Sequence, residues 1–221
     1  MKLKICIFWL CLCFFGFSAY AQETITVAVA SSLYPALQQR AEAFEQEYNV
    51  SIRLVSGSTG RLYNQILHGA PFDVFIAADE QRPALLMQQG KAVEQYDLGQ
   101  GYLGVLRGHE QITGLHQLTD PSIRHIAIAN PDVAPFGQAG KIVLQQQGLW
   151  HQLKHKFVYA QNAMQAKMMV NKGLVDAGFV PVKSSGQSIA QIQYYGLILA
   201  DRDVARQWLN SLVQQHSVAS R

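Results

Sequence analysis

The chain has 221 residues, of which 49% are hydrophobic and 15% charged, and its formal net charge is only +3. Such a composition is ordinary for a folded globular protein. A nearly neutral chain is not built to bind nucleic acid or an anionic membrane through bulk charge. We therefore expect one large domain or two small ones, with no nucleic-acid partner.

The first 21 residues have the pattern of a secretory signal peptide. Lys2 and Lys4 precede an apolar run over 5–17, and residues 18–21 end in an A-x-A cleavage site. The run is shorter than the ~20 apolar residues that a membrane-spanning helix needs, so an uncleaved anchor fits less well. We expect cleavage after Ala21, a periplasmic location and no membrane insertion of the mature chain. Loss of the two lysines lowers the formal charge from +3 to +1.

All three cysteines lie inside this leader, at Cys6, Cys11 and Cys13. The mature chain, residues 22–221, therefore needs neither a disulfide nor thiolate chemistry, although it is exported. A lipoprotein signal would place a cysteine at the cleavage point, and this leader matches that pattern poorly. We therefore favour a soluble exported protein.

The first half of the mature chain alternates extended and helical patterns. Strands are expected over 24–29, 51–55 and 73–77, and helices over 33–48, 61–68 and 80–89. In the first helix, apolar residues recur every three or four positions, and Pro35 fits only the first turn, where its missing N–H has no partner to lose. This alternation predicts an α/β protein with a parallel, doubly wound sheet.

The pattern restarts after a longer extended segment over 101–106. Strands are expected over 125–129, 157–159 and 177–182, an extended piece over 195–199, and helices over 138–147, 162–171 and 201–215. Two α/β units joined by extended crossings predict two lobes with a cleft. We assign residues 22–99 and 200–221 to lobe 1 and residues 100–199 to lobe 2.

Four strand-to-helix turns have the same chemical character: 30–33, 57–60, 134–137 and 161–164. Each presents the free N–H groups of a helix start, at the end of a strand where ligands bind in open α/β sheets. A helix N-terminus carries roughly +0.5 charge, so several that converge on one point bind an anion. The first two turns add hydroxyls and none contains Lys or Arg. Neutral donors suit a small, fully deprotonated oxyanion, which only accepts hydrogen bonds.

Each turn alone has a simpler explanation, because Ser, Thr and Asn are common helix caps. The anion-site hypothesis therefore depends on the four turns meeting in one cleft. On this hypothesis the serines that follow the first strand both cap the next helix and donate to the ligand.

Five segments of the chain resemble the periplasmic molybdate-binding proteins of ABC importers. They are Val-Ala-Ser-Ser-Leu at 29–33, Gly-Ser-Thr-Gly-Arg-Leu at 57–62, Gly-Ala-Pro-Phe-Asp-Val-Phe at 69–75, Asn-Pro-Asp-Val-Ala-Pro-Phe-Gly at 130–137 and Asp-Ala-Gly-Phe-Val at 176–180. The resemblance covers nearly the whole mature chain. It implies a two-lobed, type II-like periplasmic binding protein, each lobe a mixed or parallel sheet flanked by helices with hinge crossings between them.

The same resemblance implies an extracytoplasmic protein that captures molybdate or tungstate for import and meets an ABC transporter permease. It implies no enzyme activity and no cofactor, and we expect a monomer. The alternative is the same fold serving another ligand, such as sulfate, another oxyanion, an organic acid or a metal, in an exported receptor or sensor.

The resemblance also implies six ligand-binding residues, all at the four turns: Ser31, Ser32, Ser58, Thr59, Phe136 and Ala163. Ser32 matches a serine that gives its hydroxyl and its backbone N–H to the oxyanion. Thr59 stands where the family usually has a serine. Phe136 and Ala163 match positions that use the backbone N–H, so their side chains need not be polar. Ser31 and Ser58 adjoin Ser32 and Thr59 in the sequence, and their hydroxyls either cap a helix or contact the ligand.

Pro181 departs from the family, which often has a tyrosine there whose hydroxyl donates to the oxyanion. A hydrogen bond to a charged group is worth ~1.5–3 kcal/mol, so its loss weakens binding by roughly 10- to 150-fold unless another donor compensates. Nearby candidates for that donor are Ser184, Ser185, Tyr194 and Tyr195. Arg61 either reaches the ligand or lies on a solvated helix face, which is the usual place for arginine.

Two other kinds of site fit the sequence less well. His151 and His155 have the i, i+4 spacing of metal ligands, but no Glu lies between them and no third ligand is evident, which favours a solvated face. A hydrolase needs a nucleophile, a base and an orienting group. The turn at 57–60 is not a Gly-x-Ser-x-Gly nucleophile elbow, and no His or acid has a motif spacing to it.

Overall fold

The computed structural model describes residues 22–183 and 185–219, so the expected leader lies outside the described residues. No helix within these two ranges combines the length and the apolar character needed to cross a bilayer. The strands are β1 (Glu23–Ala30), β2 (Val50–Gly57), β3 (Val74–Ala77), β4 (Glu94–Arg107), β5 (Glu110–Gln111), β6 (Ile126–Ala129), β7 (Phe157–Ala160), β8 (Ala177–Val182) and β9 (Ala190–Ile198). The α-helices are α1 (Tyr34–Tyr48), α2 (Thr59–Leu67), α3 (Gln81–Gln88), α4 (Pro135–Gln146), α5 (Trp150–Leu153), α6 (Ala163–Asn171) and α7 (Asp203–Ala219).

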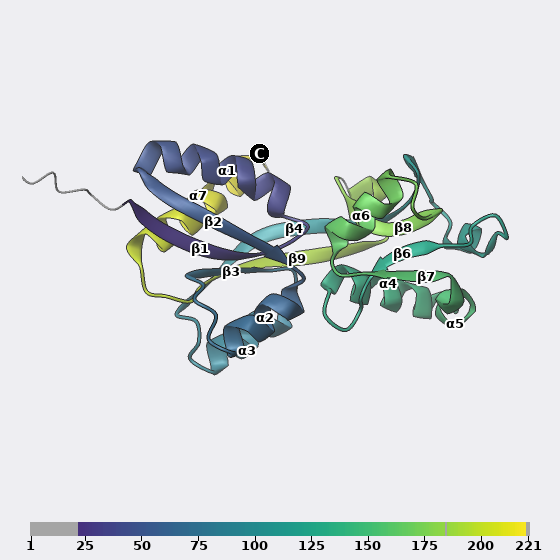
Figure 1. Ribbon diagram of the computed structural model, residues 1–221, viewed down its shortest axis with the longest axis horizontal. Coiled ribbons are helices and arrows are strands. Elements are labelled where there is room, and N and C mark those ends of the chain that lie inside the picture. Colours follow the sequence, from purple (N-terminus) through teal and green to yellow (C-terminus); the bar gives the residue numbers. More distant parts are fainter. Residues whose placement is uncertain (1–21, 184, 220–221) are drawn as a thin grey trace, which may run out of the picture.

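The strands form one mixed sheet in the order β2-β1-β3-β9-β4-β8-β6-β7, with β5 paired to β4. The pairings of β1 with β2 and β3 are parallel, and so are those of β6 with β7 and β8. Between these two groups, β9 and β4 run antiparallel to their neighbours. Figure 1 shows the two groups at opposite ends of the molecule, with β4 and β9 extending from one to the other. The α/β class and the two-lobed arrangement are therefore confirmed, with a mixed rather than wholly parallel sheet.

Helices cover both faces of each lobe (Figure 1). In lobe 1, α1 and α7 lie on one face and α2 and α3 on the other, and in lobe 2, α6 lies opposite α4 and α5. The spacing predicted for the first helix is observed, because Leu37, Ala41 and Phe44 are buried and Pro35 lies in the first turn. Trp208 of α7 is completely buried in the largest core cluster.

The sequence placed most elements within a few residues of their observed bounds, but it missed the first halves of β4 and β9. The extended piece expected over 195–199 is the second half of β9. The segment expected over 101–106 is the second half of a 14-residue strand. The β4–β9 pairing shifts register between Asp97 and Gln100, and residues 195–198 of β9 also pair with β3. The lobe boundaries at 99/100 and 199/200 stay a prediction. Residues 195–198 fall in the predicted lobe 2 but pair directly with β3 of lobe 1.

The Gly-Ala-Pro-Phe-Asp-Val-Phe segment ties lobe 1 together. The Asp73 carboxylate accepts a hydrogen bond from the Thr26 backbone N–H at 2.7 Å and one from Arg202 at 3.0 Å. Arg202 also pairs with Glu23 at 2.7 Å. This motif therefore joins β1, β3 and the start of α7, and it positions the site without lining it.

Candidate functional site

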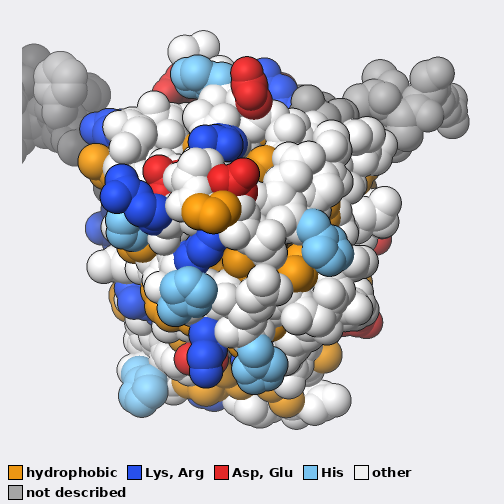
Figure 2. Space-filling model, turned by 90° about the vertical axis from the view of Figure 1, so that its right-hand side faces the viewer, with side chains coloured by type: hydrophobic (Ala, Val, Ile, Leu, Met, Phe, Trp, Pro, Cys, Tyr) orange, Lys and Arg blue, Asp and Glu red, His pale blue; other side chains and the backbone are white. Residues whose placement is uncertain are grey.

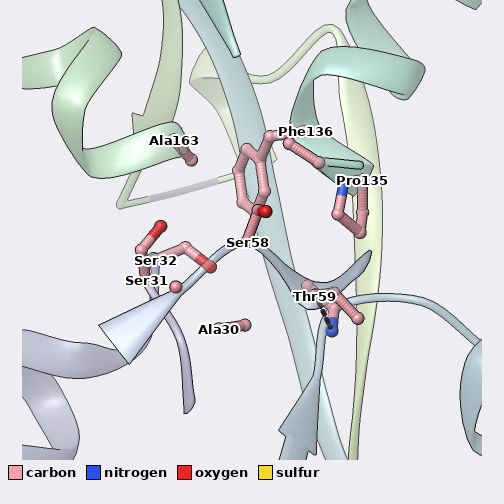
Figure 3. A pocket seen from close by; sticks show the side chains of 11 residues that line it. Ala30, Ser31, Ser32, Ser58, Thr59, Pro135, Phe136 and Ala163 are labelled. Atoms are coloured by element: carbon pink, nitrogen blue, oxygen red, sulfur yellow. Dashed lines mark hydrogen bonds between the residues drawn. The ribbon is translucent and has the colours of Figure 1, made fainter. Parts of the chain in front are cut away.

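One cavity lies where the two lobes meet, and all six residues predicted to bind the ligand line it. The lining residues are Ala30, Ser31, Ser32, Gly57, Ser58, Thr59, Ala78, Ala134, Pro135, Phe136 and Ala163. Figure 3 shows the labelled serines and Thr59 on one side of the cavity and Ala163, Phe136 and Pro135 on the other. The cavity encloses about 200 Å³ of empty space, including its opening to solvent. Because this volume also counts space open to solvent, the room inside is small and fits only a small ligand.

The serines of lobe 1 do not cap helices, and the prediction that Ser31 and Ser32 cap α1 is wrong. Leu33 occupies the cap position of α1, and no side chain donates or accepts there. Ser58 occupies the cap position of α2 but likewise makes no capping bond. The Ser31 N–H donates to the Gly57 carbonyl at 2.9 Å, which holds the two turns against each other. The hydroxyls therefore remain free for other partners.

Three hydroxyls of lobe 1, those of Ser32, Ser58 and Thr59, are available to donate into the cavity. Thr59 Oγ1 accepts the backbone N–H of Ala78 at 3.1 Å, so its own proton is left to donate. Ser58 Oγ is buried and has no hydrogen-bond partner among the described residues. Ser32 Oγ lies 2.9 Å from the hydroxyl of Tyr194. A buried hydroxyl without a partner is costly, and a ligand that accepts hydrogen bonds would satisfy it.

Lobe 2 brings two helix starts to the cavity, and their side chains there are apolar. Pro135 and Phe136 form the first turn of α4, and Ala163 is the first residue of α6. A Cβ on Gly137 would lie 1.8 Å from the Ala129 carbonyl oxygen, so the start of α4 sits directly on the end of β6. Asn162 caps α6 by accepting the Gln165 N–H at 2.9 Å. What both starts offer a ligand is free backbone N–H groups.

No charged side chain is found among the described residues that line the cavity. Arg61 is exposed and lies outside the lining. Arg82 lies nearby, but its guanidinium pairs with Asp79 at 2.6 Å. The site is therefore a set of neutral donors with the partial positive charge of helix starts.

Close contacts between the lobes flank the cavity, and the sequence did not predict them. The Gly60 N–H donates to the Val133 carbonyl at 2.8 Å, and Arg82 donates to the Asp132 carbonyl at 3.5 Å. A Cβ on Gly60 would lie 2.8 Å from the Val133 oxygen. Only a glycine permits this approach, and a glycine directly after a predicted ligand residue was the available signal.

Position 181 supplies no donor, and Pro181 is not among the residues that line the cavity. Pro181 is in β8, opposite Leu103 of β4. Of the four residues considered as replacements, Ser184 lies outside the described residues, Ser185 is exposed and Tyr195 is partly buried but outside the lining. Tyr194 reaches the site through Ser32.

The histidines do not assemble a metal site within the part of the chain that the structure describes, where no three candidate ligands cluster. His151 and His155 are both exposed. Figure 2 views the end of lobe 2, where histidine and basic side chains are dispersed among neutral ones.

Comparison with known proteins places this chain in a family. Residues 25–198 match the family model described as bacterial extracellular solute-binding protein. The molybdate-binding protein ModA of Azotobacter vinelandii is 34% identical over 168 residues, which are 74% of this chain and 66% of that protein. ModA of Rhodobacter capsulatus is 31% identical over 165 residues, 73% of this chain and 65% of that protein. The matches thus span just under two thirds of these relatives' own length.

A solved structure agrees with these matches. The periplasmic molybdate-binding protein of Azotobacter vinelandii superposes with a TM-score of 0.75 at 28% identity, covering 85% of this chain and 92% of that one. The family binds solutes outside the cell and is not a family of enzymes, which confirms the expectation of a binding protein. Because the family model spans most of the sequence, this chain belongs to the bacterial extracellular solute-binding proteins.

Proposed function

We propose that this protein is the periplasmic receptor of an ABC importer, and that as a monomer it captures a fully deprotonated tetrahedral oxyanion, molybdate or tungstate, for delivery to the permease. The observation that carries the proposal is a small cavity, at the junction of two lobes, lined by hydroxyls and helix starts and by no charged side chain among the described residues. The names of the two relatives, both molybdate-binding proteins, support the choice of oxyanion.

The chemistry of the lining favours an anion that only accepts hydrogen bonds. Hydroxyls and amides donate to each oxygen, and a hydrogen bond to a charged group contributes ~1.5–3 kcal/mol. The free Ser58 hydroxyl is a buried donor that such an anion would satisfy. A protonated oxyanion would need a carboxylate to accept its proton, and the described lining contains none.

Closure of the lobes supplies the trap. Hydroxyls come from lobe 1 and amides from lobe 2, so the anion meets both sets only when the lobes close. The Gly60–Val133 hydrogen bond belongs to this closed arrangement. The ligand then adds its own bonds to this contact and shifts the population toward the closed form.

Calorimetry on the exported protein tests the proposal, with molybdate, tungstate, sulfate and phosphate as ligands. We expect micromolar or tighter binding of molybdate and tungstate, and weaker or no binding of phosphate, which keeps a proton at neutral pH. Heat with sulfate alone would identify a different oxyanion receptor. No heat with any of the four would overturn the proposal and direct the search to organic acids or metals.

A further inference from the structure

We propose that Tyr194 is a positioning residue for the oxyanion: its hydroxyl donates to Ser32 and turns the Ser32 proton toward the ligand. This inference rests on the proposed function. It assigns Tyr194 an indirect part in place of the direct tyrosine donor that the family resemblance implies at Pro181.

The geometry joins two distant parts of the chain. Tyr194 belongs to β9 and is only 4% exposed, and its hydroxyl oxygen lies 2.9 Å from Ser32 Oγ in the turn after β1. Ser32 lines the cavity and Tyr194 does not, so the tyrosine stands behind the serine. Tyr194 therefore acts on the ligand only through Ser32.

The direction of this hydrogen bond follows from the ligand's chemistry. Either hydroxyl of the pair can donate to the other. A fully deprotonated oxyanion has no proton, so Ser32 must donate to it, and the remaining bond then requires Tyr194 to donate to Ser32. Each bond in such a chain polarises the next. Burial also raises the pKa of Tyr194 to about 12, which keeps its proton in place at neutral pH.

The phenol ring is held in position by the neighbouring strand. A Cβ on Gly101 of β4 would lie 2.4 Å from the Tyr194 hydroxyl oxygen and 2.5 Å from Cε2. The ring thus lies directly against the Gly101 backbone, where any larger residue would displace it. Both β4 and β9 cross between the lobes, so the strands that link the lobes also orient the Ser32 hydroxyl on the lobe 1 side of the cavity.

Substitution of Tyr194 tests the role directly. In Tyr194→Phe we expect molybdate affinity, measured by calorimetry, to fall by about 2- to 12-fold, the value of one neutral hydrogen bond. Tyr195→Phe is the matched control, because consecutive strand residues point to opposite faces, and its affinity should equal that of the wild type. Thermal unfolding of each variant checks the fold. Wild-type affinity in Tyr194→Phe would overturn the inference.

A double-mutant cycle separates positioning from a structural role. If Tyr194 acts through Ser32, then Tyr194→Phe should cause no further loss of affinity once Ser32→Ala is present. Equal losses in both backgrounds would overturn the inference, because the tyrosine would then act independently of the serine.

A second variant covers the case in which Tyr194→Phe does not fold. Gly101→Ala keeps the phenol but displaces it, and we expect the same loss of affinity, again absent in the Ser32→Ala background. An unchanged affinity in Gly101→Ala would contradict the inference. A wild-type protein that binds no oxyanion would refute the proposed function and this inference together. A wild type that binds, with variants that bind equally well, would refute the inference alone.

Discussion

The lobe 1 and lobe 2 rims, the two sides of the cavity, both present hydrogen-bond donors, but the donors differ in chemistry. The lobe 1 rim presents hydroxyls from Ser32, Ser58 and Thr59, each without a capping role at the helix start beside it. The lobe 2 rim presents the first turns of α4 and α6, where Phe136 and Ala163 have apolar side chains. The donors of lobe 1 are side chains and can therefore be predicted from residue type. In lobe 2 the donors belong to the backbone, and any residue with an N–H suffices.

This difference predicts opposite sensitivities to substitution. Replacing a hydroxyl in lobe 1 removes a donor, but replacing a lobe 2 side chain leaves the amide in place. In lobe 2 only a change to the backbone removes a donor, and proline is the residue that makes this change.

The largest effect is expected for Ala163→Pro, which removes an amide N–H at the first position of α6. Proline is tolerated at a first helical position, and the preceding Asn162 is extended at φ −158° and ψ 172°, as a residue before proline prefers. Molybdate affinity by calorimetry should fall by roughly 10- to 150-fold, the value of a hydrogen bond to a charged group. Ala163→Gly keeps the N–H and should bind nearly as well as the wild type. Equal affinities for the two variants would show that this amide does not hold the anion.

The next effect contrasts a neutral donor with a charge. Ser32→Ala should weaken molybdate binding by about tenfold or more, because it removes a hydroxyl that faces the anion. Arg61→Ala should change the affinity little, because Arg61 is exposed and lies outside the lining. Titration calorimetry at two salt concentrations measures both. The opposite order would mean that a cation, rather than neutral donors, holds the anion.

Thr59→Val should affect stability as well as binding. It removes the acceptor of the Ala78 N–H, which is buried, and an unsatisfied buried donor costs about 1–3 kcal/mol. Urea unfolding should report this loss in the free energy of unfolding, and Thr59→Ser should restore most of it. If the valine and serine variants have the same free energy of unfolding, the Thr59 hydroxyl does not stabilise the fold.

The smallest effect is expected away from the cavity, at Asp176 in lobe 2. Backbone N–H groups of His125 and Arg124 donate to its carboxylate at 2.8 Å and hold its pKa below the usual value of 3.8. A carboxylate whose pKa is lowered by folding stabilises the fold at pH values above its ordinary pKa. This stabilisation is lost as the pH falls through the lowered pKa. Asp176→Ala should therefore cost under about 1 kcal/mol at neutral pH, and less below pH 3.8.

Urea unfolding of Asp176→Ala and the wild type across this pH range measures the difference, with molybdate affinity at neutral pH as the control. A loss of affinity at neutral pH would show that the lobe 2 rim depends on contacts well outside its helix starts.

The residues of the candidate site could be predicted from the sequence more completely than the contacts that hold them in place. The periodicity of α1 and the character of the four turns depend on neighbouring residues, so local patterns and the family resemblance were enough to bring Ser32, Thr59 and Ala163 together. The capping role given to Ser31 and Ser32 was wrong, because a serine before a helix has the same signature whether it caps that helix or not. Tyr194 and Ser32 are 162 residues apart, and no local pattern links them.

By itself, the sequence determined the α/β elements, the helix starts and the absence of charge at the four turns, because these depend on residue type and short-range spacing. Only the tertiary structure decided that the crossing strands β4 and β9 pair with each other, that Gly60 meets Val133, and that Tyr194 stands behind Ser32. Such contacts arise where strands distant in the chain become neighbours in the sheet, and their distances depend on packing that residue spacing does not encode.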